Sequence, residues 1–301
     1  MFGKSRQKQT GDFPEEFDSN FYRSKYPRLS GMDDATLRKH YSLHGRTEGR
    51  QASPAALRSG FIPLFEHIRP ILEIGPFDRP MVEGDKVSYF DVLGQEDLQK
   101  KAIANNRGGT VPYIEFVSEI GDLSIVDRKF NAVCSAHCIE HQVDLIAHLD
   151  NVAKVLEGGG YYFIAAPDKR YSFDHFIPES TVADIIDAHK EPRKTHSLAN
   201  IIKHVALATH NDAPRHWEGI HADPGYEQEI GGKIKAALNL FDKANGRYID
   251  AHAWRFSPST FRNLMEILSS IDLIPFDIVR VYETPKPRVE FMAILRKKME
   301  E

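Results

Sequence analysis

The sequence predicts an α/β fold: a doubly wound, mostly parallel sheet with a C-terminal antiparallel hairpin, a small N-terminal helical unit and a helical insertion. Strand-like apolar runs alternate with helix-like segments over residues 68–167, and this alternation is typical of a parallel sheet with right-handed crossovers. It stops over residues 168–250, which are rich in His, Asp and Pro. Two alternating segments, 277–283 and 290–297, then follow with a short Pro-rich link between them, which predicts the hairpin.

Composition limits the kind of protein that this chain forms. With 301 residues, 41% of them hydrophobic, the chain is able to bury a full core. Its formal charge of −4 provides no basic field for a long nucleic acid, so we expect no nucleic-acid partner. The only two cysteines, Cys134 and Cys138, lie close together in the sequence, which fits a reducing compartment better than a disulfide framework. The first residues lack the apolar core of a signal peptide and no apolar run is long enough for a membrane span, so we expect a cytoplasmic protein.

Two units are expected along the chain. Residues 1–55 should form an N-terminal helical module and linker, with a short helix that carries Phe17 and Tyr22 and a second helix that Gly45 ends. Residues 51–60 are small and polar and are expected to link this module to the main domain over 56–301. The oligomeric state is left open.

The main domain has a predictable order of elements. Strands are expected at 68–74, 86–92, 113–119, 129–136 and 161–167, and helices at 95–106 and 144–157. Gly158, Gly159 and Gly160 are expected to end the second of these helices. Within the insertion, helical pieces are expected near 179–190, 196–209 and 227–243. Ser257 or Ser259 is expected to cap a later helix, with Pro258 early in it.

Polar residues and glycine follow the ends of these strands, where an open α/β sheet binds its ligand. Gly75 would allow a ligand to approach the backbone closely, and Asp91 would accept hydrogen bonds from both ribose hydroxyls of a nucleoside. Asp122 either accepts from an adenine amino group or caps a helix, and the sequence leaves both open. His137 and His141 flank an acidic residue at the end of the fourth strand, where either imidazole would contact a substrate or cofactor.

The segments LEIGP, YFD, GDLS, FNAVCSAHCIEH and VAKVLEGGGYYFIAAPD, in this order, resemble the class I S-adenosylmethionine (SAM)-dependent methyltransferases. The resemblance covers roughly residues 65–170 and 255–297, and is closest to the small-molecule, type 11-like branch associated with bacterial glycan and polysaccharide genes. It implies a Rossmann-like fold, SAM as cofactor, and methyl transfer to a small polar acceptor, for which we expect a sugar hydroxyl in glycan biosynthesis. The cofactor contacts that it implies are Glu73, which would orient the ammonium group, Gly75, Asp91, Asp122, Ala136 and His137. The segment FYRSKYP…HYSLHGRTEGR also looks like a helical module that accompanies some bacterial glycan-modifying enzymes.

The sequence departs from the family in its first loop, where Pro76 and Phe77 follow Gly75 in place of further glycines. Only residues 75–85 separate the first two strands, so the usual helix must be reduced to a turn. An alternative hypothesis is therefore a methyltransferase-like binding module whose degenerate first loop no longer binds the cofactor and which catalyses no reaction.

The insertion is expected to supply the acceptor side of the site, covering the mouth of the sheet. Its polar segments, 167–176, 209–226 and 250–254, fit three interpretations: a carbohydrate or polyol pocket with Trp217 and Trp254 as platforms, a loop held by its own hydrogen bonds, or a metal site. No recognised ligand spacing occurs, so no metal site is predicted. The candidates for the general base are His141, His175, His216 and His252, and the residues expected to orient the imidazole are Asp174 and Asp212.

Overall fold

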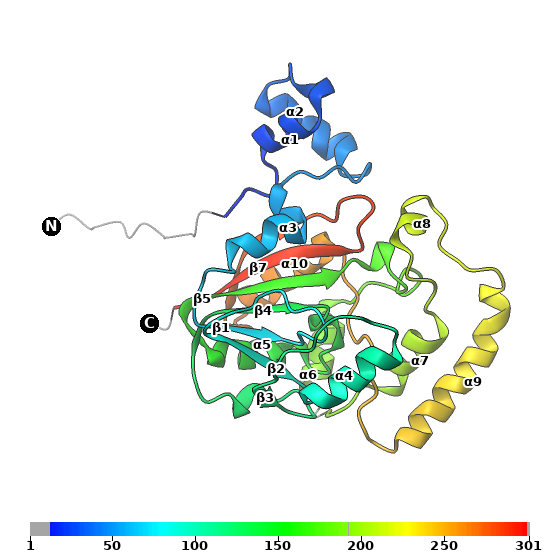
Figure 1. Ribbon diagram of the computed structural model, residues 1–301. Helices are drawn as coiled ribbons and strands as arrows, with labels where there is room; N and C mark the ends of the chain where they lie inside the picture. The colour runs from blue at the N-terminus through cyan, green and yellow to red at the C-terminus, as the bar shows by residue number, and fades with distance from the viewer. Residues whose placement is uncertain (1–12, 192, 300–301) are drawn as a thin grey trace.

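The computed structural model describes residues 13–191 and 193–299, which contain a seven-stranded sheet of order β3-β2-β1-β4-β5-β7-β6 (Figure 1). Strands β1 to β5 pair in parallel, and β7 pairs antiparallel with both β5 and β6. The predicted fold class is confirmed, including the C-terminal hairpin. The strands are β1 (Ile71–Ile74), β2 (Val87–Asp91), β3 (Phe116–Val117), β4 (Phe130–Ala136), β5 (Leu156–Pro167), β6 (Phe276–Tyr282) and β7 (Glu290–Lys297).

Successive side chains of the strands enter two separate apolar cores because strand residues alternate between the two faces of a sheet. On one face, Leu72 and Ile164 pack in the core that contains the apolar sides of α5 (Leu145–Val155), α6 (Val182–Lys190) and α10 (Pro258–Ser270). On the other face, Ile71 and Phe163 pack with Phe61 and Phe65. The sheet is therefore buried on both sides, which explains its nearly continuous apolar strands.

The segment between β1 and β2 contains no helix among its residues, all of which the structure describes. It forms a turn at 77–79 and then an irregular path to Val87, as the short spacing predicted. After β2 comes α4 (Gln95–Ala104), which packs with Leu98 against Val111 and Ile114.

The expected end of the helix over 144–157 was wrong. The helix α5 ends at Val155, before the three glycines, and β5 already begins at Leu156. Gly159, with a φ of 77°, lies inside the strand, close to Met299 and Arg296. The glycines therefore bend a strand instead of ending a helix, because pairing with β4 begins at Leu156, ahead of them.

The expected linker over residues 51–60 is also structured and largely buried. It forms a 3-10 turn at Pro54–Ala56, followed by α3 (Arg58–Phe61) and a second 3-10 turn at Ile62–Leu64. Gln51 and Ser53 are buried, and Ala55 and Ala56 pack in the same core as Phe163. This segment covers one face of the sheet, which its polar composition did not indicate.

The N-terminal unit consists of α1 (Ser19–Lys25), a 3-10 turn at Pro27–Leu29, α2 (Asp34–His40) and a π-helical turn at Tyr41–Gly45. Phe17, Tyr22 and Tyr41 form its small aromatic core. Glu16 joins the unit to the main domain, since its carboxylate accepts from the Val281 backbone N–H at 2.7 Å and contacts Arg262. In Figure 1 the helices stand above the β7 side of the sheet.

The insertion contains α6, α7 (Leu198–Ala206), α8 (Ala213–Trp217) and α9 (Tyr226–Ala244). Three of these helices match the predicted positions, whereas α8 lies in a segment expected to be a loop. It begins at the Asp212 side chain, which accepts from the Arg215 backbone N–H, and at Pro214. Helices α7 and α9 pack together through Ile201 and Ala237.

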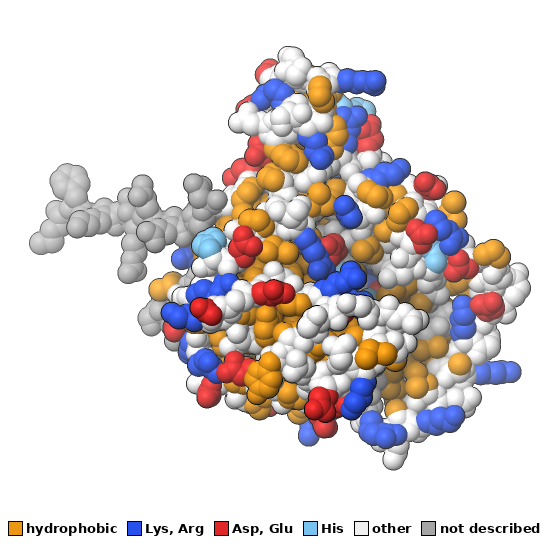
Figure 2. Space-filling model, viewed as in Figure 1, with side chains coloured by type: hydrophobic (Ala, Val, Ile, Leu, Met, Phe, Trp, Pro, Cys, Tyr) orange, Lys and Arg blue, Asp and Glu red, His pale blue; other side chains and the backbone are white. Residues whose placement is uncertain are grey.

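No helix in the described part of the chain is long and apolar enough to cross a membrane. Figure 2 shows acidic and basic side chains interspersed on the viewed face, without one extended basic patch.

Candidate cofactor pocket and histidine cluster

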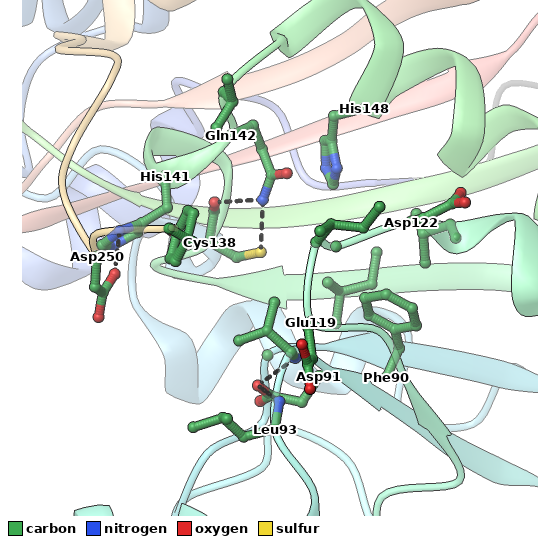
Figure 3. A pocket seen from close by; sticks show the side chains of 18 of the residues that line it. Phe90, Asp91, Leu93, Glu119, Asp122, Cys138, His141, Gln142, His148 and Asp250 are labelled. Atoms are coloured by element: carbon green, nitrogen blue, oxygen red, sulfur yellow. Dashed lines mark hydrogen bonds and ion pairs between the residues drawn. The ribbon is translucent and has the colours of Figure 1, made fainter. Parts of the chain in front are cut away.

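A cavity of about 730 Å³ lies at the carboxyl ends of β1, β2 and β4 (Figure 3). Its wall includes Gly75 after β1, Asp91 at the end of β2, and His137 and Cys138 after β4. The strand order reverses between β1 and β4, and such a switch point is where open α/β sheets bind ligands. The sheet therefore places a cavity of this size where the sequence predicted a cofactor.

The first loop lines the cavity without closing it. Gly75 has a φ of 69°, a conformation that favours glycine, and a Cβ there would come within 3.7 Å of Cys138. Phe77, also at positive φ, lines the wall and packs its ring beneath the guanidinium of Arg107 at 4.9 Å. The aromatic ring thus leaves the cavity open.

Asp91 lies in the pocket wall and is 8% exposed. One carboxylate oxygen accepts from the backbone N–H of Val92 at 2.7 Å, and this bond fixes the side chain at the end of β2. Burial raises the pKa of Asp91, and the backbone donors oppose that shift. Both backbone donors bond to Oδ1 of Asp91. No described residue of the pocket wall donates to Oδ2, so Oδ2 can accept a hydrogen bond from a ligand.

Asp122 both lines the pocket and caps a short helix. Its Oδ1 accepts from the Ser124 backbone N–H at 2.9 Å, and its Oδ2 accepts from the Ser124 hydroxyl at 2.8 Å. These two bonds lower the pKa of Asp122. The capping alternative is therefore present in the structure, and a ligand contact would have to share these oxygens.

Glu73 does not line the cavity. Its carboxylate lies on the opposite face of the sheet and accepts from the backbone N–H groups of Met81, at 2.9 and 3.0 Å, and Val82, at 3.2 Å. Burial raises the pKa of Glu73 to about 7, although these donors and Arg58 act against the shift. Glu73 thus supports the first loop instead of contacting the ammonium group of a cofactor. Ile74 lines the pocket, and its neighbour Glu73 points to the opposite face because successive strand residues alternate.

The two residues expected after β4 differ in position. Ala136 is the last residue of β4, and its side chain packs in the core instead of the pocket wall. His137 lines the pocket with a φ of 50°, and its Nε2 lies 2.9 Å from Glu290. Glu290 is in turn held by Arg58 at 2.7 Å.

Two of the four candidate base residues, His141 and His252, meet beside the pocket. Their rings pack edge to face with centroids 4.6 Å apart. Only His141 of this pair lines the cavity, whereas His252 is 4% exposed behind it. Between them lies Glu140, whose Oε1 is 3.8 Å from His141 Nε2 and 3.9 Å from His252 Nε2.

Acidic side chains contact the outer nitrogens of both rings. His141 Nδ1 lies 3.0 Å from Asp250, and His252 Nδ1 lies 2.5 Å from Asp174. Burial lowers the pKa of His141, but Asp250 and Glu140 outweigh burial and raise the pKa overall. One of the two predicted orienting residues, Asp174, is therefore in contact with an imidazole.

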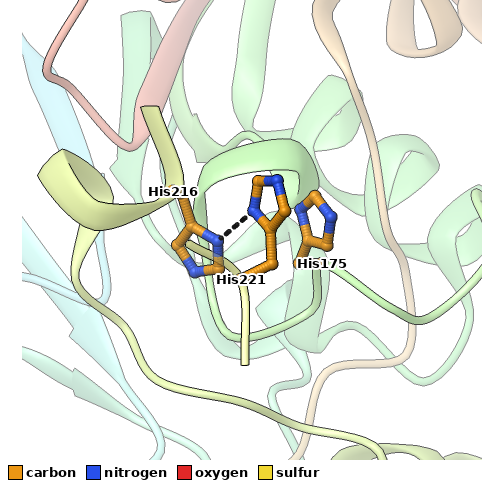
Figure 4. Close-up of side chains that lie close together, drawn as sticks. All are labelled: His175, His216 and His221. Carbon is orange, nitrogen blue, oxygen red and sulfur yellow. Dashed lines mark hydrogen bonds between the residues drawn. The ribbon is translucent and has the colours of Figure 1, made fainter. Parts of the chain in front are cut away.

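The other two candidates, His175 and His216, lie in a separate group with His221 (Figure 4). The rings of His175 and His221 stack at 3.7 Å, and His216 Nδ1 is 3.1 Å from His221 Nδ1. Burial lowers the pKa of His216 to about 4. None of these residues lines the cavity, so the structure does not bring all four candidate bases together. The second orienting candidate, Asp212, caps α8.

The aromatic platforms expected for an acceptor are also outside the cavity. Trp217 stacks on Tyr171 at 3.7 Å and donates to the Arg288 carbonyl, so its ring is occupied. Trp254 is buried and donates to the Gln142 carbonyl at 2.6 Å. The segment 209–226 is held largely by its own contacts, as one of the three interpretations stated.

Several wall residues were not predicted from the sequence. Tyr248, Arg193 and Lys194 enter from the insertion, and Lys101 enters from α4. No local pattern identifies them, because they belong to segments that meet the strand ends only after folding. The insertion covers the mouth of the sheet, but through these residues instead of the histidine-rich loop.

No known protein family matches the sequence, and comparison with curated proteins finds no match. Among solved structures, the chain is similar to magnesium protoporphyrin IX methyltransferase (ChlM) from Synechocystis PCC 6803 with bound S-adenosylhomocysteine. That likeness has 11% identity, a TM-score of 0.36, and covers 92% of this chain and 96% of that one. A SAM-dependent methyltransferase from Clostridium acetobutylicum ATCC 824 is similar at 8% identity, with a TM-score of 0.38 and coverage of 88% and 98%. At these identities and TM-scores the likenesses assign no activity to this chain. The strand order and the cavity at the switch point are the features of the chain itself that bear on its function.

Proposed function

We propose that this protein is a SAM-dependent methyltransferase that acts on a small polar acceptor. The observation that carries the proposal is the cavity at the switch point, with a glycine turn after β1 and the Asp91 carboxylate after β2. This arrangement suits a nucleoside: Asp91 would accept from the ribose hydroxyls, and Gly75 would allow close approach of the remaining part of the cofactor. The cavity volume of about 730 Å³ is within the range of small-molecule sites.

The charge of the wall favours SAM over a dinucleotide. Among the described lining residues, five are acidic, namely Asp91, Glu119, Asp122, Asp144 and Asp250, and three are Lys or Arg. An acidic wall is favourable for a sulfonium and an ammonium group and unfavourable for a pyrophosphate. The missing helix between β1 and β2 removes the N-terminus at which a dinucleotide places its pyrophosphate, and it is also the departure on which the alternative of a non-catalytic binding module rests.

On the acceptor side, we assign the activating role to the group formed by Glu140, His141 and His252. The cofactor supplies a methyl group on a sulfonium that is already activated, so the protein has to align the acceptor, exclude water and remove the acceptor proton. His141 is the member of the group at the cavity wall, and Asp250 orients its ring. The acceptor class, a sugar hydroxyl in glycan biosynthesis, rests on the sequence resemblance alone.

Calorimetric titration of the protein with SAM and with S-adenosylhomocysteine tests the proposal. Micromolar binding that the Asp91→Asn variant weakens would support a cofactor site at the switch point. Binding absent at millimolar SAM would favour the alternative, a methyltransferase-like module without turnover. A radiolabelled methyl transfer assay with nucleotide sugars and free sugars then separates a binding module that retains SAM from an enzyme.

A further inference from the structure

Glu140 is a buried carboxylate without a hydrogen-bond partner among the described residues. Its side chain is 0% exposed, and neither oxygen accepts a hydrogen bond from any residue that the structure describes. A buried ionised carboxylate is costly unless a partner offsets the charge. The fold nevertheless holds this residue firmly in place, because its backbone carbonyl accepts from the N–H groups of Ala253 and Trp254 at 2.7 and 3.1 Å.

Nitrogens from three histidines lie near Glu140 Oε1, with His137 Nδ1 at 3.7 Å and the Nε2 atoms of His141 and His252 only slightly farther away. The ligand atoms of Glu140, His141 and His252 all lie within 4.8 Å of one another, and Oε1 is 3.8 and 3.9 Å from the two Nε2 atoms. Two ligands of a tetrahedral zinc ion, with bonds of about 2.0–2.2 Å, are separated by roughly 3.4 Å. The three atoms therefore lie close together at spacings somewhat wider than those around a bound zinc ion, and a cation between them would draw the side chains inward.

An acidic side chain lies next to the outer nitrogen of each imidazole. Asp250 contacts His141 Nδ1 at 3.0 Å, and Asp174 contacts His252 Nδ1 at 2.5 Å. At His252, the hydrogen bond with Asp174 holds the proton on Nδ1 and leaves Nε2 unprotonated, whereas the contact between His141 Nδ1 and Asp250 does not have hydrogen-bond geometry. A carboxylate behind each ligand histidine is the usual outer shell of a protein metal site.

The three carboxylates around His141 and His252 differ in whether they form an ion pair with Lys or Arg. Asp250 lies 3.1 Å from Lys101, and Asp174 lies 3.3 Å from Arg255. Each outer carboxylate thus has a Lys or Arg of its own, whereas the described structure gives Glu140 no such ion pair and places only imidazoles of three histidines near it. A divalent cation at the inner atoms would offset its charge.

From these relations we infer that Glu140, His141 and His252 form a binding site for a divalent transition-metal ion of the zinc class. Two imidazole nitrogens and one carboxylate oxygen suit such an ion, and three protein ligands leave a position open. The second histidine group fits a metal less well, because the rings of His175 and His221 are stacked with an interplanar angle of 7° and their nitrogen lone pairs do not converge.

The site adjoins the cofactor cavity through His141, which lines it. A cation there would connect the loop after β4 to the end of the insertion and would act on an acceptor as a Lewis acid, with His141 as its ligand instead of a free base. Metal binding itself does not depend on methyl transfer, so a failed activity assay and a failed metal titration are distinguishable.

The test is titration of the chelator-treated protein with Zn²⁺, followed by calorimetry and by thermal unfolding. We expect one tight site in the wild-type protein and a higher unfolding temperature with Zn²⁺. Glu140→Gln keeps the side-chain shape and should weaken Zn²⁺ binding at least about 100-fold. Asp250→Asn, at a half-exposed outer residue, should weaken it about 10-fold.

The matched control is His221→Gln, which removes one member of the second histidine group. It should leave the tight site intact. Loss of the site in His221→Gln with retention in Glu140→Gln would overturn the assignment, and so would a wild-type protein that binds no Zn²⁺ at 100-fold molar excess. Because Glu140→Gln removes a buried charge, its unfolding temperature without metal should be equal to or higher than that of the wild type, which separates lost binding from lost folding.

Discussion

Asp250 lies 3.0 Å from the Nδ1 atom of His141, and this contact joins the end of the insertion to the loop after β4. Asp250 also lies 3.1 Å from Lys101 of α4. Three segments that are distant in sequence therefore meet at one carboxylate on the wall of the cavity. This convergence positions the imidazole that is proposed to act on the acceptor.

Asp91→Asn should weaken SAM binding about 10- to 100-fold, because a hydrogen bond to a charged acceptor contributes about 1.5–3 kcal/mol. Asp122→Asn is the comparison variant. Both oxygens of Asp122 already accept from Ser124, so its effect on the dissociation constant should be several-fold smaller. Calorimetric titration of both variants checks the order, and an equal or reversed order would contradict the placement of the ribose at Asp91.

His141→Gln should lower kcat for methyl transfer about 100-fold or more while leaving the dissociation constant of SAM within about threefold. The reason is that His141 belongs to the group that activates the acceptor, whereas the proposed ribose contact is made elsewhere in the wall. The control is His44→Gln, an exposed histidine in the N-terminal unit, which should retain wild-type kinetics. A His141 variant with unchanged kcat would exclude His141 from acceptor activation.

Glu73→Ala should lower the free energy of unfolding by about 2–4 kcal/mol, because it leaves the buried N–H groups of Met81 and Val82 without an acceptor. Glu73→Gln retains one acceptor oxygen and should cost about 1 kcal/mol. Urea unfolding measures both, with the exposed Glu157→Gln as a control expected to change stability by less than about 0.5 kcal/mol. If Glu73→Ala proved as stable as the control, the support of the first loop by this carboxylate would be refuted.

His148 should make stability depend on pH below neutrality. Burial lowers its pKa to about 4, and its Nε2 lies 3.2 Å from the Tyr162 hydroxyl. In the unfolded chain the imidazole has a pKa of about 6.5. The stabilisation of the folded state by the neutral His148 is therefore complete above pH 6.5 and is lost as the pH falls toward 4. The difference in unfolding free energy between wild type and His148→Gln should thus shrink by roughly 3 kcal/mol over this range. A difference independent of pH would show that the imidazole is not buried in neutral form.

Gly45→Ala should destabilise the N-terminal unit by about 1–3 kcal/mol. A Cβ at this position would lie 2.4 Å from the Tyr22 hydroxyl and 2.8 Å from the Tyr41 ring, and both rings belong to the small core. Gly31→Ala is the matched control, because nothing lies within 4 Å of its added Cβ. Thermal unfolding compares the two, and equal melting temperatures would contradict the packing described around Gly45.

The sequence by itself determined the sheet and the position of the pocket. Apolar runs at β1, β4 and β5 predicted strands buried on both faces, which are typical of a parallel sheet covered by helices. The short spacing between Gly75 and Val87 excluded the first helix, and Asp91 was recognised because it ends a strand.

Only the tertiary structure decided which polar residues meet. Glu73 and Asp91 both belong to strands next to the pocket, yet strand alternation directs one to the opposite face. His141 and His252 meet beside the pocket, whereas His175 and His216 join a separate group with His221 away from it. The reason is that the insertion folds back on the sheet through 248–254 instead of through its histidine-rich loop. Such encounters depend on the path of the whole insertion, which no local periodicity or spacing encodes.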